Sequence, residues 1–299
     1  MGVEKSEQVG AKKVFRLDIL REIFYIFTLN LLSLLLPLSF LLLSRLSKAQ
    51  YVFTSQSGES SFLLSLFLYT NPTLLHILVL FVSVTALLVG LTGEFSTLHG
   101  LNNGASGVIP VTTSTRIMEP KLYTAWILLC TLQVCVGLGI EGTIAAGIWN
   151  LEYDFEYDVP NENYMFIVRF FFLVGLLETM LHWSRTFVRP VVDDTVFGRA
   201  KGEERWWVER LVMGASFGVL WWWRLRDEVE GLVVVVETKR GLEMGLGISD
   251  FVSWWLYYLT VTIGVVRLAR GLLWFGKVMF VRRRIEVCDG CSCGSDDKV

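Results

Sequence analysis

Six long apolar stretches run through this chain, and lysine and arginine residues alternate with them. The stretches lie at about residues 23–43, 72–91, 122–149, 164–183, 206–223 and 251–281. A transmembrane helix needs about 20 predominantly apolar residues to cross a hydrocarbon core of about 30 Å. Because every backbone polar group must be satisfied inside lipid, each stretch is expected to be a helix. The pattern predicts an all-α integral membrane bundle of about six transmembrane helices.

The composition supports this class. Of the 299 residues, 53% are hydrophobic and 19% are charged, and the mean hydropathy is +0.51. A soluble domain usually has about 25% charged residues and fewer apolar ones. The net charge of −2 comes with no basic face or nucleic-acid motif, so no nucleic acid is expected to bind. The expected partners are the lipid bilayer and other membrane proteins.

The distribution of positive charge predicts the orientation of the spans. Lysine and arginine are frequent in residues 1–22, in the loop after the fourth span and in residues 282–299, whereas residues 150–163 contain none. Cytoplasmic segments carry the excess of these residues. We therefore expect a cytosolic tail over 1–22, a membrane domain over 23–281, and a cytosolic basic, Cys-rich tail over 282–299. The expected location is the endoplasmic reticulum or the plasma membrane, and no residue pattern selects between them.

One loop disagrees with that orientation. The segment 224–250 would lie outside, yet it contains Arg224, Arg226, Lys239 and Arg240. It also contains the apolar run 232–236, rich in valine. Two interpretations remain open: a small exterior strand in this loop, or a fifth span that re-enters the membrane. The fifth span is therefore the weakest point of the predicted topology.

Two ionisable residues near the exterior face are predicted to pair. Glu141 lies about 10–12 Å below the exterior interface if the third span ends near Trp149. Arg169 lies about 7 Å below the same interface if the fourth span begins near Tyr164. An unpaired charge at this depth would cost a few kcal/mol. The similar depths on consecutive antiparallel helices predict a salt bridge between Glu141 and Arg169.

A second layer of ionisable residues is expected near the cytosolic face of the last three spans. Its members are Glu178, His182, Glu209, Arg210, Arg267 and Arg270. Glu178 and His182 are four residues apart and so share one side of a helix. Glu178 can pair with Arg210, Arg267 or Arg270. This layer is either a polar path or ligand pocket, or a set of charge pairs that fixes helix register, and the second interpretation is favoured because such pairs need no substrate.

No catalytic constellation is found. The three histidines, at 76, 99 and 182, are not placed as a metal pair with a carboxylate at helical spacing. There is no Gly-x-Ser-x-Gly elbow, Walker A sequence or His-Glu-x-x-His motif. A lipid enzyme using Glu178 and His182 as an acid/base pair would lack a nucleophile or metal. The chain is therefore expected to have no catalytic residue, metal or cofactor.

Both ends of the chain carry candidate lipidation sites. The opening Met-Gly-Val-Glu-Lys-Ser matches the short N-myristoylation pattern at Gly2. Cys288, Cys291 and Cys293 follow three arginines beyond the last span, where palmitoylation is common. The same cysteines could bind zinc, although no fourth ligand is nearby, or remain unmodified thiols.

These patterns favour a structural, assembly or partner-binding membrane protein. The alternative is a small transporter or channel component that uses the buried charges of the third to sixth spans.

Overall fold

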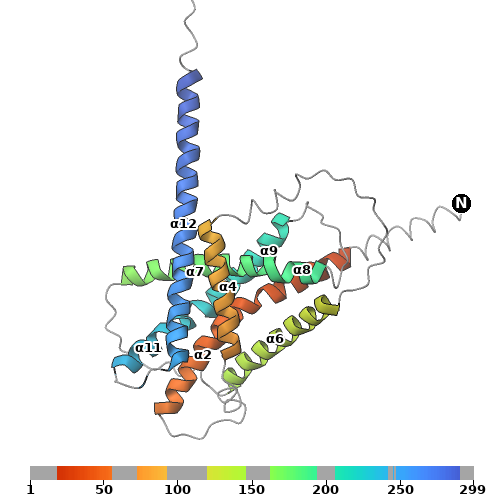
Figure 1. Cartoon of the computed structure of the whole chain (residues 1–299), viewed down its shortest axis with the longest axis vertical. Helices are drawn as coiled ribbons and strands as arrows, with labels where there is room; N and C mark the ends of the chain where they lie inside the picture. Colours follow the sequence, from red (N-terminus) through yellow and green to blue (C-terminus); the bar gives the residue numbers. More distant parts are fainter. Residues whose placement is uncertain are drawn as a thin grey trace, which may run out of the picture.

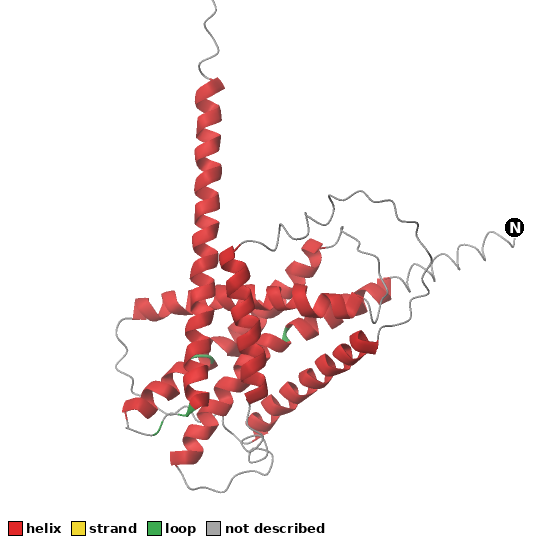
Figure 2. Cartoon of the chain, viewed as in Figure 1, coloured by secondary structure: helices red, strands yellow, loops and turns green. Residues whose placement is uncertain are grey.

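The computed structural model describes residues 19–55, 73–92, 120–145, 162–193, 206–241, 245 and 247–289. These residues are almost entirely helical, and no strand occurs among them (Figure 2). The prediction of an all-α fold is confirmed for this part of the chain. The helices cross one another at various inclinations rather than forming one parallel bundle (Figure 1).

The first helix passes through the centre of the molecule. Residues 19–33 are helical, and α2 (Leu35–Ser55) continues after a break at Leu34. The break follows from Pro37, whose missing N–H leaves the carbonyl of Ser33 without its usual helical donor. Hydrogen bonds of 3.0 Å, from Leu34 N to Asn30 O and from Leu38 N to Leu34 O, keep the two parts connected. This helix is the most buried of the candidate membrane spans.

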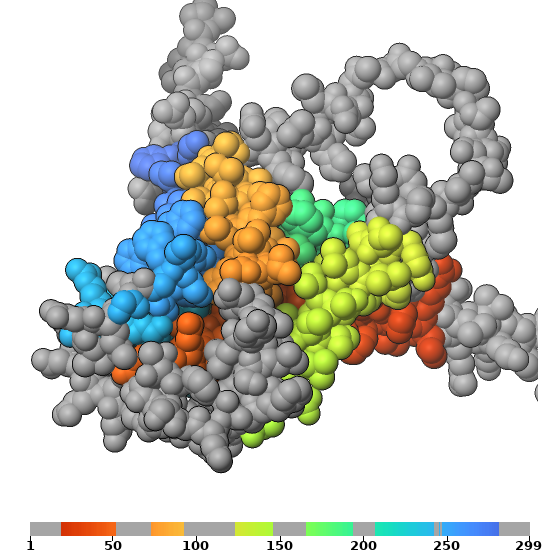
Figure 3. Space-filling model, turned by 60° about the horizontal axis from the view of Figure 1, so that its bottom comes forward, coloured from red at the N-terminus to blue at the C-terminus, as the bar shows by residue number. Residues whose placement is uncertain are grey.

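Three further helices pack around this centre. The helix α6 (Pro120–Ala145) lies along α2, and α4 (Thr73–Thr92) lies along α12 (Ile248–Asp289). Pro120 suits the first turn of α6, where a backbone N–H has no helical partner. In the space-filling view α4 separates α12 from α6 on one face of the molecule (Figure 3).

The helix α7 (Glu162–Trp183) crosses α12 (Figure 1). It runs through a π-helical turn, η3 (Ser184–Val188), into the short α8 (Arg189–Val192). The N–H of Arg189 bonds to the carbonyl of Ser184, five residues earlier, as in a π turn. Pro190 explains the wider turn, because its ring would clash with the carbonyl four residues before it in a regular α-helix.

The segment expected to be the fifth span is a helix with a second π turn. The helix α9 (Trp206–Leu220) continues through η6 (Trp221–Leu225) into α10 (Arg226–Glu228). After two turn residues the chain forms α11 (Gly231–Gly241). The predicted exterior strand at 232–236 is therefore wrong. The valine side chains favour a strand locally, but burial of Leu232 and Val235 at 0% exposure against the helical core stabilises a helix instead.

Five described helices are long and apolar enough to cross a membrane by length and composition: Ile19–Tyr51, Thr73–Thr92, Tyr123–Ala145, Phe166–Val192 and Ile248–Phe280. The expected fifth span, 206–223, is not among them. Its regular part, α9, has 15 residues, fewer than the roughly 20 that a crossing needs. The prediction of six spans is not confirmed. The tails on which the predicted orientation depends lie mostly outside the described residues, and the cytosolic location of both ends stays a prediction.

The last helix is much longer than a membrane span. At 1.5 Å per residue, the 42 residues of α12 extend about 63 Å. Its first half packs against α7 and α4, and its second half projects beyond the other helices (Figure 1). Leu272, Trp274 and Phe280 on that second half are 70%, 67% and 77% exposed. Exposed apolar side chains such as these, on a helix without protein neighbours, are typical of a membrane environment.

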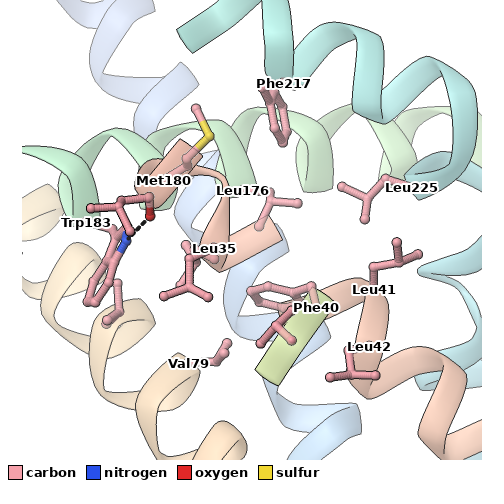
Figure 4. Packing of buried hydrophobic residues seen from close by; sticks show 14 of the residues in the cluster. Leu35, Phe40, Leu41, Leu42, Val79, Leu176, Met180, Trp183, Phe217 and Leu225 are labelled. Carbon is pink, nitrogen blue, oxygen red and sulfur yellow. Dashed lines mark hydrogen bonds between the residues drawn. The ribbon is translucent and has the colours of Figure 1, made fainter. Parts of the chain in front are cut away.

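One hydrophobic cluster holds the helices together. Phe40 of α2 meets Phe172 of α7 edge to face, with 6.0 Å between ring centroids. Leu176 and Met180 extend this contact along α7 (Figure 4). The indole N–H of Trp183 donates to the carbonyl of Leu32 at 3.1 Å, just before the helix break. The cluster fixes α2 against α7 and so positions Arg45 and Lys48 in the second half of α2.

Candidate functional site

The most buried charge of the described helices is Arg45 on α2, which is 3% exposed. Its Nε and Nη2 atoms both donate to the carboxylate of Glu228, the second over 2.8 Å. Its Nη1 atom donates to Thr143 Oγ1 of α6 over 3.2 Å. Arginine paired with a carboxylate by two parallel hydrogen bonds is strong and directional. One guanidinium thus joins α2, α6 and α10.

The first span was predicted to end at about residue 43, so Arg45 and Lys48 would lie in the loop after it. They instead lie on the continuing helix α2, which ends at Ser55. The Ser44 hydroxyl also donates to the backbone carbonyl of Glu228. Gly231, at the start of α11, lies so close to α2 that a Cβ atom there would be 2.7 Å from Ser44 Oγ. These contacts draw the segment 228–231, expected outside, against the central helix.

The predicted salt bridge between Glu141 and Arg169 is wrong. Arg169 on α7 pairs with Glu230 through two hydrogen bonds, the one from Nη2 being 2.8 Å long. Glu141 is exposed on α6. The error arose because residues 224–230 were treated as an exterior loop, whereas they continue the α9 helix and its following turn. The unexpected basic residues of that loop were the signal of a folded segment, and Arg224 lies 3.5 Å from Glu228 in an i,i+4 pair.

A second buried pair, Lys239 with Asp250, ties α11 to the start of α12. Lys239 Nζ is 2.8 Å from Asp250 Oδ1, and the two side chains are 8% and 6% exposed. The other carboxylate oxygen accepts the backbone N–H of Gly247 over 3.1 Å. A carboxylate in the first turn also interacts favourably with the helix dipole. No sequence pattern predicts this pair, because only the fold brings the two residues together.

The predicted second layer is divided among several contacts, two of which involve α12. Glu178 on α7 pairs with Arg267 on α12, with 3.3 Å between Oε2 and Nε. This is one of the three partners that sequence spacing allowed. Arg270 donates to the carbonyl of Gly90 near the end of α4. His182 lies within electrostatic range of Glu178 and Arg185.

The remaining members lie nearer to α8 and the start of α9. Arg189 is 3.7 Å from both Asp193 and Glu209, measured between charged atoms. The Tyr25 hydroxyl donates to Asp193 Oδ1 over 2.7 Å, which connects the first helix to this group. Arg210 lies within electrostatic range of Arg185. The structure therefore distributes the six residues of the predicted layer over several helix contacts.

The candidate lipidation sites are mostly beyond these contacts. Gly2, Cys291 and Cys293 lie outside the described residues, and Cys288 lies in the last turn of α12. Within the described segments, no three His, Cys, Asp or Glu side chains group as a metal site requires.

The arrangement is one in which opposite charges from different helices bind one another. The five described helices that are apolar enough to span a membrane indicate a helical membrane protein. No family model, curated protein or solved structure matches the chain.

Proposed function

We propose that this protein is a non-catalytic membrane protein with a structural, assembly or partner-binding role. The observation that carries the proposal is the direct pairing of its charges. Arg45, Lys239 and Arg267 each contact a carboxylate on another helix, and Arg169 contacts one in the turn before α11. Charges that satisfy one another hold helices in register and need no bound substrate. Charges that are paired within the protein support a scaffold more than a pathway for solutes.

The alternative is a transporter or channel component. The observation that favours it is the accessibility of the pair between α7 and α12, where the Glu178 and Arg267 side chains are 28% and 55% exposed. A carboxylate in such a place can exchange its partner for an ion. This alternative and the scaffold differ in what happens when Glu178 loses its charge.

Charge reversal tests the structural role of this pair. Glu178→Arg or Arg267→Glu alone places like charges together, and we expect each to lower the free energy of unfolding by about 1 kcal/mol, as for accessible ion pairs. The double reversal, which restores opposite charges, should recover most of that loss. Thermal unfolding of the full chain in detergent micelles measures all three. A double variant no more stable than the single ones would contradict a structural pair.

A flux measurement separates the two functions. Vesicles containing the full chain should pass protons and chloride no faster than protein-free vesicles, because the scaffold proposal requires no path. Glu178→Gln should leave that background unchanged. A flux that Glu178→Gln abolishes, while the unfolding temperature is retained, would contradict the scaffold and support the transporter.

A further inference from the structure

The helix α6 carries one carboxylate on its outward side. Glu141 is exposed, and no hydrogen bond or ion pair joins it to another residue in the part of the chain that the structure describes. It lies inside the candidate span Tyr123–Ala145 and is the only charged residue in the sequence between Lys121 and Glu152. A carboxylate that faces lipid is costly, and ionisable residues of membrane spans usually face the interior of a bundle, where opposite charges pair. Glu141 departs from this rule.

The cation of α2 that reaches α6 binds a different carboxylate. Arg45 donates to the carbonyl of Ile140 and to the hydroxyl of Thr143, the residues on either side of Glu141. Thr143 is 2% exposed, so these contacts are on the buried side of α6. The Nε and Nη2 atoms of Arg45 are directed to Glu228. Glu141 thus lies at the level of a buried ion pair but on the opposite, outward side of its helix.

The residues around Glu141 leave room for another helix. They recur at the spacing of one helix side, and we call them the outer face of α6: Val134, Gly137, Leu138, Glu141 and Ile144. A Cβ atom on Gly137 would have no atom within 4 Å, and Val134 and Leu138 are 60% and 57% exposed. The helix α6 lies at the surface of the molecule (Figure 3). Small residues let membrane helices approach closely, and Gly137 is one turn from the carboxylate.

We propose that the outer face of α6 binds a transmembrane helix of another protein that carries a lysine or arginine at the level of Glu141. The cation would pair with the carboxylate, and the two backbones would approach each other at Gly137. The partner helix would thereby place Glu141 in the interior of a larger bundle, where charged residues of membrane spans are usually found. This inference rests on the proposed partner-binding role and gives the chemistry of the partner.

The cations of α12 show why a second copy of this chain is not the expected partner. Arg267 and Arg270 already bind groups of α7 and α4. Lys277 is exposed, but it lies on the half of α12 that projects beyond the other helices, whereas α6 ends on the side of the molecule where α12 begins (Figure 1). Copies inserted in the same orientation would hold Lys277 and Glu141 on opposite sides of the membrane. The complementary cation is therefore expected on a different protein.

Binding of model helices to the full chain in phosphatidylcholine vesicles tests the site. The first probe is a leucine–alanine helix of about 20 residues, long enough to cross the bilayer, with one lysine a single turn from its end. The second probe has methionine in place of the lysine. Energy transfer from a fluorophore on the chain to one on the probe measures binding. The wild-type chain should bind the lysine helix about tenfold more tightly, as polar contacts between model membrane helices allow.

Three variants locate the binding face. Glu141→Gln should make the chain bind the lysine helix no more tightly than the methionine helix, because the charge that distinguishes the two probes is lost. Gly137→Leu adds a side chain where the helices would approach, and it should weaken binding of the lysine helix by about tenfold. Gly271→Leu makes the same change on α12, where a Cβ atom also has no atom within 4 Å, and it should leave this binding unchanged.

The outcomes separate this site from its alternatives. Equal binding of the two probes by the wild-type chain would overturn the proposal, whether or not any variant folds. Equal weakening by Gly137→Leu and Gly271→Leu would also overturn it, since binding would then not depend on the outer face of α6. Energy transfer between two labelled copies of the chain that Glu141→Gln abolishes would overturn it in favour of a second copy. None of these results depends on a flux through Glu178, so the scaffold role and this site can fail separately.

Discussion

Replacing Glu228 by glutamine is expected to lower the free energy of unfolding by about 3–5 kcal/mol, the usual cost of removing one partner of a buried ion pair. The reason is the position of Arg45, which is 3% exposed and donates from Nε and Nη2 to this carboxylate. Lys48 lies within electrostatic range of both Arg45 and Glu228, so the variant would leave two cations close together. Denaturant or thermal unfolding of the full chain in micelles measures the change.

The adjacent residue provides the control. Asp227 pairs with Arg226 at 3.0 Å, but its side chain is 61% exposed. Asp227→Asn removes the same charge one position earlier. It should lower the free energy of unfolding by no more than about 0.5 kcal/mol, as for exposed ion pairs. Equal losses from Glu228→Gln and Asp227→Asn would show that Arg45 does not depend on Glu228.

A second substitution separates the buried charge from a general defect in α10. Combining Glu228→Gln with Arg45→Met removes the cation that the first change leaves behind. Buried ion pairs replaced on both sides by uncharged groups are often as stable as the original pair. The double variant should therefore recover most of the stability lost in Glu228→Gln. A further loss on adding Arg45→Met would indicate that Arg45 acts mainly through Thr143 and the carbonyl of Ile140.

The fold class was accessible from sequence because it depends on the local pattern of apolar residues. The stretches at about 72–91 and 251–281 are read from length and composition alone, which is why α4 and the apolar part of α12 match them closely. The partners of the charges depend on which helices meet. Glu230 is 61 positions from Arg169, and Glu228 is 183 positions from Arg45, so no helical spacing links either pair.

The segment 224–241 shows why the site could only be predicted in part. Its valine run favours a strand locally and its charges favour an exterior loop. Both tendencies yield to packing, because Leu225, Val229 and Leu232 are 0–2% exposed against the core. The failure of the positive-charge rule in this loop did mark the place where the fold departs from a simple series of spans. The charge pattern marks the exception, but no local pattern indicates that Glu228 and Glu230 contact α2 and α7.

The contact between α7 and α12 should be the most sensitive to added volume. A Cβ atom on Gly264 would meet the carbonyl of Phe171 and lie 3.0 Å from the backbone N of Gly175. A Cβ on Gly175 would likewise lie 2.9 Å from Gly264 N. Backbone atoms cannot rotate away as a flexible side chain can, so the two helices would have to separate. Small residues let membrane helices approach this closely, and the buried Thr179 and Thr260 lie one turn away on the same faces.

We therefore expect Gly264→Ala to lower the free energy of unfolding by about 3 kcal/mol, the upper end of the usual cost of overpacking. A Cβ atom on Gly271, two turns further along α12, would have no atom within 4 Å. Gly271→Ala should therefore raise the free energy of unfolding by up to about 1 kcal/mol, because alanine has the higher helix propensity. Replacing glycine by alanine is thus expected to lower the free energy of unfolding at position 264 and to raise it at position 271. Thermal unfolding of the two variants in micelles measures both changes. If both changes stabilise the chain, α7 and α12 do not meet at Gly175 and Gly264, and the crossing that places Glu178 beside Arg267 would be wrong as well.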